Sequence, residues 1–277
     1  YANNQWRPGR DVADDPARSS FRLAMGKAQG TVTILDRSAT TYTRVWCSYE
    51  IFVSLSRSNE EDHAYLYDVY TAADDNTAVG LTDGCAAEDV DDDGDPDLLT
   101  KFDRERHFPL DRAQRALEAD VFRAKASEEK DRTHILNAIA NRGAGCLDEE
   151  VYAWHPRYDA VNRTLRGRFA LGCWRVAVEQ GSPEVERLSA ALQESGLKKV
   201  QLHLNSMPWR EKNLDRSRFM KSLAEALPAR RQTERLEIDL RTNDLDAAHC
   251  APFFEGLGHL RQLSALELSL HGNRLGD

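Results

Sequence analysis

Three short segments near the end of the 277-residue chain alternate apolar and polar residues, and their spacing constrains the fold more than any other feature of the sequence. The segments are residues 200–204, 236–240 and 266–270. Alternation with a period of two is typical of a strand that is buried on one face. The first segment begins 36 residues before the second, and the second begins 30 residues before the third. A spacing this regular predicts an array of similar structural units.

The surroundings of the three segments are also similar. Each predicted strand follows a helical pattern with two apolar residues four positions apart, which are Leu188 and Leu192, Leu223 and Leu227, and Phe253 and Leu257. The last two strands are followed by Asn-x-Leu at 243–245 and 273–275, where asparagine can bond to backbone at the strand exit. In the first copy, residues 205–209 replace this motif, which predicts that the next helix begins late, at about Asp215.

These residues resemble leucine-rich repeats of the ribonuclease-inhibitor type over residues 183–277, and the last copy stops inside a repeat, so we expect truncation there. The resemblance implies an α/β solenoid of stacked strand-plus-helix units, with the strands on its concave face. The residues expected to point outward from the strands, and to bind a protein partner, are Gln201, His203, Glu237, Asp239, Glu267 and Ser269. Such an array offers a wide polar surface without an enclosed pocket. A merely solvated sheet face is the alternative.

The N-terminal half has a different pattern. Residues 21–28 predict a helix, 31–36 a strand, 45–55 a second helix and 65–70 a second strand. Strands that alternate with helices imply a parallel sheet with crossover helices. Side chains at the strand ends, such as Asp36, are then expected at the carboxyl edge where ligands bind in such sheets.

Within this half, Trp46-Cys47-Ser48-Tyr49-Glu50-Ile51 fits W-C-x-x-E-[LI]. Together with its flanking elements, from about 21 to 70, it resembles the central part of a TIR (Toll/interleukin-1 receptor) domain. The resemblance implies a TIR-like domain over residues 1–145, truncated before its opening strand, that serves as an assembly module and self-associates. In TIR domains that cleave NAD this glutamate is the catalytic carboxylate, which makes Glu50 its counterpart here. A carboxylate beside the ribose stabilises an oxocarbenium-like transition state.

Blocks at residues 1–6, 79–84 and 134–139 are similar to segments of uncharacterised proteins of single-celled eukaryotes that join such a domain to leucine-rich repeats. That similarity supports the order of domains and implies no activity.

An acidic segment interrupts the first half. Residues 83–97 contain eight acidic residues and no lysine or arginine, and residues 89–97 fit D-x-D-x-D-G-x-x-D. Alternate carboxylates in such a loop converge on a hard cation, and the segment resembles calcium loops of the EF-hand and integrin-propeller kinds. Thr100 stands where an EF-hand has its bidentate glutamate, and no second copy exists. A solvated acidic insertion is the alternative, and we predict neither a metal site nor a bound cofactor.

Glycines at 143 and 145 end a helical stretch over residues 101–142, so residues 146–182 are expected to form a linker and a capping helix. Five widely spaced cysteines indicate reduced thiols and a cytoplasmic location. The net charge of -9 disfavours nucleic acid and anionic membranes as partners. A mean hydropathy of -0.62 predicts no membrane-spanning helix.

The sequence therefore favours a protein-interaction or signalling scaffold. Two alternatives remain open: an NAD-cleaving hydrolase that uses Glu50, and a calcium-responsive interaction protein that uses residues 89–97.

Overall fold

The computed structural model describes residues 14–58, 65–74, 77–227, 233–260 and 263–276, so the block at residues 1–6 lies outside the described residues. The chain divides into two compact units. Unit 1 consists of Tyr1–Gly84 and Glu118–Asn162, and unit 2 of Cys85–Leu117 and Arg163–Asp277. This division differs from the predicted boundaries after residues 145 and 182, because the acidic segment and the two helices after it belong with the C-terminal strands.

Unit 1 contains the predicted helix–strand–helix–strand order. Its elements are η1 (Pro16–Arg18), α2 (Ser20–Met25), β1 (Gly30–Leu35), η2 (Thr40–Thr43), α3 (Val45–Ser58), β2 (Leu66–Ala72), β3 (Ala78–Leu81), α6 (Glu129–Ile139), η3 (Ala144–Cys146) and the start of α7 (Pro156–Glu179). The four predicted elements are confirmed, with ends shifted by a few residues. The region between 118 and 128, which was predicted to be helical, has no helix.

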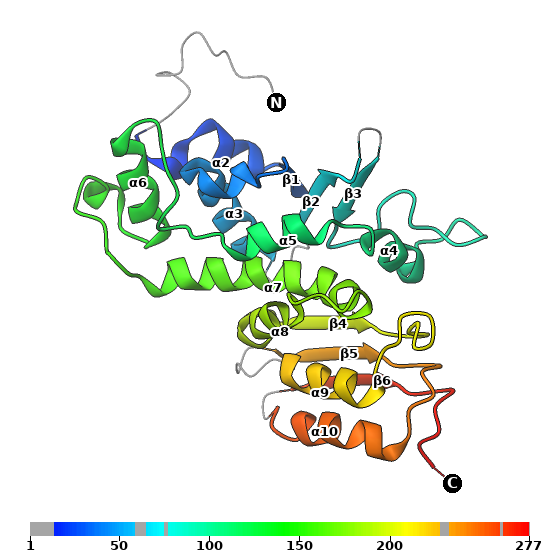
Figure 1. Ribbon diagram of the computed structural model, residues 1–277. Coiled ribbons are helices and arrows are strands. Elements are labelled where there is room, and N and C mark those ends of the chain that lie inside the picture. Colours follow the sequence, from blue (N-terminus) through cyan, green and yellow to red (C-terminus); the bar gives the residue numbers. More distant parts are fainter. Residues whose placement is uncertain (1–13, 59–64, 75–76, 228–232, 261–262, 277) are drawn as a thin grey trace. The chain divides into compact units, whose positions relative to one another are not determined.

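The sheet of unit 1 has the order β1-β2-β3 (Figure 1). Strands β1 and β2 are parallel, and α3 lies between them in the chain, as expected for a crossover. Strand β3 was not predicted, and it runs antiparallel to β2, so the sheet is mixed and not wholly parallel. The reason is the short connection after β2, where the N–H of Ala73 donates to the carbonyl of Thr77. A turn this short allows only an antiparallel return.

The face of this sheet toward α3 contains a partly buried polar layer. The hydroxyl groups of Thr31 and Tyr65 are 2.8 Å apart, and the Ser54 hydroxyl of α3 donates to Thr31 Oγ1 over 3.0 Å. These bonds satisfy hydroxyl groups that burial would otherwise leave without partners. On the opposite face Val32 and Ile34 of β1 are exposed.

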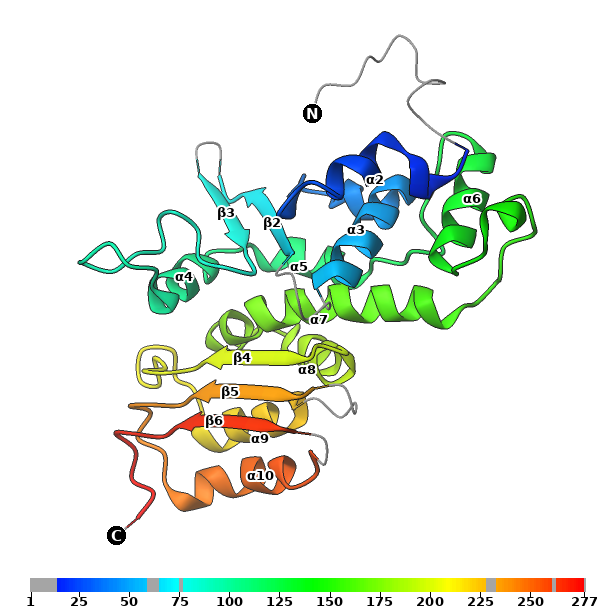
Figure 2. The ribbon, with the colours of Figure 1, turned by 180° about the vertical axis from the view of Figure 1, so that it is seen from behind.

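Unit 2 contains a second, wholly parallel sheet. Its elements are α4 (Leu98–Glu105), α5 (Leu110–Leu117), the rest of α7, α8 (Val185–Glu194), β4 (Lys199–His203), α9 (Arg216–Ala226), β5 (Arg235–Asp239), α10 (Ala247–Leu257) and β6 (Ala265–Ser269). Each strand begins and ends one residue before its predicted limits. Helices α8, α9 and α10 cover one face of the β4-β5-β6 sheet, and Figure 2 shows the strands of the other face (Figures 1 and 2).

Two asparagines connect the successive strand exits of unit 2. Buried Asn243 accepts from the N–H of Met207 over 2.8 Å and donates to the carbonyl groups of Leu204 and Leu240. Asn273, at the exit of the next strand, makes the same kind of bonds, to the N–H of Asn243 and to the carbonyl of Leu240. The asparagine of each Asn-x-Leu motif therefore joins the exit of its strand to the exit of the strand before it. Helix α9 begins directly after its N-cap, Asp215, which confirms the prediction that the helix after the first strand begins late, at about Asp215.

The C-terminal half of α7 packs against α8 and the end of β4. The indole N–H of Trp174 donates to the Ser189 hydroxyl of α8 over 2.9 Å. Arg175 donates to the carbonyl groups of His203 and Asn205 at the end of β4. These contacts join α7 to α8 and to the end of β4, and its role as a capping helix stays a prediction.

All five cysteines are unpaired. Among the described residues, none of the helices combines the length and the apolar character that crossing a bilayer requires.

Candidate functional site

The six residues predicted to face outward from the strands of unit 2 lie together. The strand register aligns them in two rows across β4, β5 and β6. The first row is Gln201, Glu237 and Glu267, and the second is His203, Asp239 and Ser269. We call this set the strand face.

The first row is a surface network of charges. The Gln201 amide donates to the Glu237 carboxylate, and Lys199 Nζ lies 3.3 Å from the same carboxylate. Burial acts to raise the pKa of Glu237, but these neighbours outweigh it and keep the pKa below its ordinary value. The Glu267 side chain is 70% exposed and lies 3.9 Å from Arg235. Glu267 is thus the most available carboxylate of the row.

The second row is already engaged within unit 2. The ring of Phe102, from α4, stacks on the His203 imidazole with 3.7 Å between ring centroids. Arg241 holds both oxygens of Asp239, at 2.9 and 2.7 Å. Burial lowers the pKa of His203 to about 4. Of the predicted contact residues, His203 and Asp239 are therefore poorly placed to meet a partner, whereas Gln201, Glu267 and Ser269 remain partly or fully accessible.

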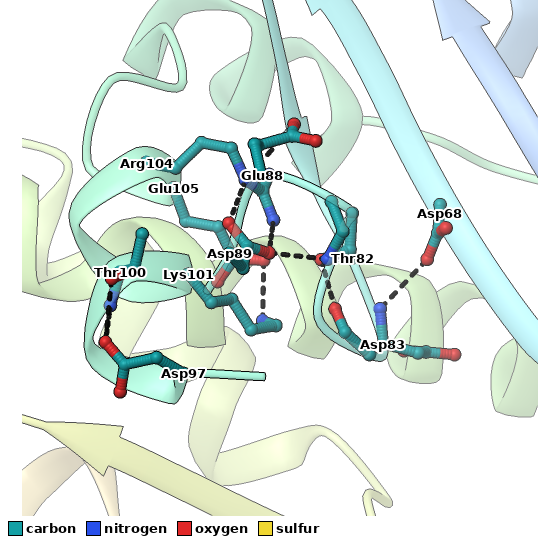
Figure 3. A network of polar contacts seen from close by, with 12 residues as sticks. Asp68, Thr82, Asp83, Glu88, Asp89, Asp97, Thr100, Lys101, Arg104 and Glu105 are labelled. Atoms are coloured by element: carbon teal, nitrogen blue, oxygen red, sulfur yellow. Dashed lines mark hydrogen bonds and ion pairs between the residues drawn. The ribbon is translucent and has the colours of Figure 1, made fainter. Parts of the chain in front are cut away.

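Sequence reasoning missed Phe102 because nothing near it in the chain connects it with β4. The acidic segment explains its position. Buried Asp89 accepts two hydrogen bonds from Arg104, each 2.7 Å long, and Asp97 caps α4 through the N–H and hydroxyl of Thr100 (Figure 3). Burial acts to raise the pKa of Asp89, but the bonds and charge of Arg104 outweigh it and leave the pKa lowered. The segment thus fixes α4 at both of its ends.

A cluster of buried charges continues from α4 to α7, and it too escaped sequence reasoning. Lys101 and Glu105 form an ion pair of 2.7 Å within α4 (Figure 3). The Glu179 carboxylate accepts from Arg106 over 2.9 Å and from Arg175 over 2.8 Å. Since buried charges are costly unless paired, this cluster fixes how α4, α7 and β4 meet.

The acidic loop that resembles calcium sites uses several of its carboxylates for other bonds. Asp89 and Asp97 are engaged as described, and Asp91 accepts from the N–H groups of Asp93 and Asp95. Within the described parts of the chain, no group of three or more histidine, cysteine, aspartate or glutamate side chains is arranged to hold a metal ion. Calcium binding by this loop stays an open alternative.

Glu50 belongs to unit 1 and lies in the second turn of α3. The start of α3 follows the carboxyl end of β1, where Asp36 accepts from the N–H and hydroxyl of Thr40 at 2.8 and 2.7 Å. The Asp36 side chain is thus used within its own loop. Glu50 is half-buried, and among the described residues its carboxylate has no hydrogen-bond or ion-pair partner.

Burial raises the pKa of Glu50, and the charge of Arg44 offsets only part of this effect. Burial also raises the pKa of Cys47, one turn earlier, and the Glu50 charge adds to it. The Trp46 indole N–H donates to Asp131 of α6 over 3.0 Å, so the tryptophan of the motif joins two helices. A half-buried carboxyl with a raised pKa can act as an acid or a base.

Comparison of the chain with protein-family models, with curated proteins and with solved structures found no significant match.

Proposed function

We propose that the strand face of unit 2 binds a protein partner, and that the chain is an interaction or signalling scaffold. The observation that carries the proposal is the alignment of three parallel strands in register, which gathers six polar side chains on one face. The asparagine bonds between strand exits support a leucine-rich-repeat solenoid as the underlying architecture. Its rigidity lowers the entropic cost of presenting a wide surface.

The accessible part of the strand face lies toward β6. The partner is expected to contact Glu267 and Ser269, because α4 occupies the β4 corner through Phe102. Unit 1 is then the TIR-like assembly module, through which copies self-associate. The five unpaired cysteines support a cytoplasmic setting for this role.

The test compares two charge reversals on the full chain. Glu267→Arg changes the strand face, and Glu255→Arg changes an exposed position on α10, on the helix side of the sheet. Proteins cross-linked to each variant and to the wild type in cell extract are quantified by mass spectrometry. We expect a partner whose recovery falls at least fivefold with Glu267→Arg and is unchanged with Glu255→Arg. Identical sets of proteins for both variants would contradict the proposal.

A second candidate function rests on the half-buried Glu50. Its raised pKa, and its place in α3, the helix that follows the carboxyl end of β1 and crosses over to β2, support an NAD-cleaving hydrolase. Nicotinamide release from NAD is measured for the wild type, for Glu50→Gln and for Glu129→Gln, an exposed glutamate of α6. The candidate requires release that Glu50→Gln abolishes and that Glu129→Gln retains. Equal release by Glu50→Gln and the wild type eliminates it.

A further inference from the structure

Two large aromatic side chains lie on the surface of unit 1, on the segment just before α7. Trp154 is 66% exposed and Tyr152 is 44% exposed. They are two positions apart in an irregular stretch between η3 and α7. Exposed tryptophan is uncommon on protein surfaces, and patches of large apolar side chains there mark interaction sites.

Both rings are held in place although they are exposed. The indole N–H of Trp154 donates to Asp159 of α7 over 2.7 Å. The Tyr152 ring has the Arg142 guanidinium 3.9 Å from its centroid and the His155 ring stacked at 5.4 Å. These contacts fix the side-chain positions before any partner arrives, which lowers the entropic cost of binding.

The backbone that carries these rings is fixed as well. The side-chain amide of buried Asn137 donates to the carbonyl groups of Leu147 and Glu149, at 2.9 and 2.8 Å. Arg142 donates to the carbonyl of Glu150 over 2.9 Å. The surface is therefore part of the packed structure of unit 1.

The charges around the two rings are mostly negative. Three consecutive acidic residues, Asp148, Glu149 and Glu150, are exposed, and one residue separates them from Tyr152. Glu149 pairs with Arg142 over 3.0 Å, and Asp148 accepts from His134, whereas Glu150 has no ion pair among the described residues. Residues 142–159 contain four acidic and two basic residues.

Besides the acidic residues, the faces of the Trp154 indole can contact a cationic partner. Its ring contacts no other aromatic ring in the described parts of the chain. The face of an indole attracts cations, and arginine most often occupies it. An anionic partner is repelled by the acidic run, and a purely apolar one gains nothing from it.

We propose that Trp154, Tyr152 and the acidic run 148–150 form a docking surface for a basic segment of a protein partner. An arginine of that segment lies on the Trp154 indole, and neighbouring cations pair with the acidic run. The surface lies in unit 1 and does not depend on the strand face proposed above.

The test follows the Trp154 indole N–H signal by NMR in the full chain, assigned from its loss in Trp154→Phe. The probe is an eight-residue peptide of alternating arginine and glycine, and the matched control peptide has neutral citrulline in place of arginine. We expect saturable shifts of the Trp154 signal with the arginine peptide and none with the citrulline peptide. About 0.5 M salt is expected to reduce the shifts, because it screens the attraction between the peptide and the acidic run. Equal shifts with both peptides, or none with either at millimolar concentration, overturn the proposal.

Three variants separate this surface from general attraction to an acidic protein. Trp154→Ala and Glu150→Lys are each expected to weaken the arginine peptide at least threefold. Phe254→Ala, which removes an exposed aromatic ring from α10 of unit 2, is the matched control and leaves the affinity unchanged. The affinity for the arginine peptide is measured by calorimetry, which needs no tryptophan signal and so also works for Trp154→Ala. An affinity that Trp154→Ala leaves at the wild-type value refutes the role of the indole.

Discussion

His203 couples the stability of unit 2 to pH. Burial lowers its pKa to about 4, with Asp239 and Glu237 opposing the shift and Lys101 and Arg175 adding to it. Between pH about 6.5 and about 4 the unfolded chain binds a proton at this histidine and the folded chain does not. Stability from this group is therefore complete above pH about 6.5 and is lost as pH falls toward 4. Urea unfolding of unit 2 at several pH values measures the loss.

His203→Gln is the control for this prediction, because glutamine does not titrate. The variant is expected to have a flatter stability profile between pH 6.5 and 4. A second check is Phe102→Ala, which uncovers the imidazole and is expected to raise its pKa, measured by NMR. Equal profiles for the variant and the wild type assign the pH dependence to other groups.

At the scale of elements, the asparagine bonds between strand exits differ in burial and so in expected cost. Asn243→Ala removes three bonds from a fully buried site, and we expect a loss of about 3 kcal/mol of unfolding free energy. Asn273→Ala removes equivalent bonds from a half-exposed site where water can replace them, and we expect about 1 kcal/mol. Urea denaturation compares the two. Equal losses contradict the role of burial.

The contact of α7 with the end of α8 leaves no room for a side chain at Gly167. A Cβ atom there lies 2.2 Å from the Ser195 Cβ and 3.1 Å from its Cα, so one helix must move. Gly167→Ala is expected to destabilise unit 2 by about 1–3 kcal/mol, although alanine favours the helix itself. Gly145→Ala, where a Cβ meets nothing within 4 Å, is the control. Thermal unfolding of both variants measures the difference. A Gly167→Ala variant that is more stable than the wild type would contradict the close packing of α7 on Ser195.

The sequence predicted the elements whose pattern of apolar residues lies within a single segment. Strands β4, β5 and β6 and helix α3 have clear periodicity, and they lie within a few residues of their predicted limits. Strand β3 is only four residues long and has no alternation of its own; its place depends on pairing with β2. Pairing between segments is a tertiary effect that a local pattern does not contain.

At the scale of the whole molecule, the same distinction explains the candidate site. The six residues of the strand face were found because their positions follow from periodicity alone. Phe102, Arg104 and Glu179 were missed because each acts through a residue that is distant in the chain. For the same reason the acidic segment looked like an insertion in the first domain, whereas the structure assigns Cys85–Leu117 to unit 2.

The assignment of the acidic segment to unit 2 predicts which unit a change in it will affect. Asp89→Asn removes the negative charge that pairs with Arg104, whose side chain is 13% exposed. We expect a cost of about 3 kcal/mol, as for other broken buried pairs, and we expect it in unit 2 alone. Hydrogen exchange followed by mass spectrometry reports the two units separately.

Asp93→Asn is the matched control, because it changes the same charge in the same segment at an exposed position. Faster exchange in β4, α8 and α9 with Asp89→Asn, and not with Asp93→Asn, is the expected result. Faster exchange confined to β1, β2 and α3 assigns the acidic segment to unit 1 instead. Because a carboxylate that binds Arg104 is not available to a cation, added calcium is expected to leave the difference between the two variants unchanged.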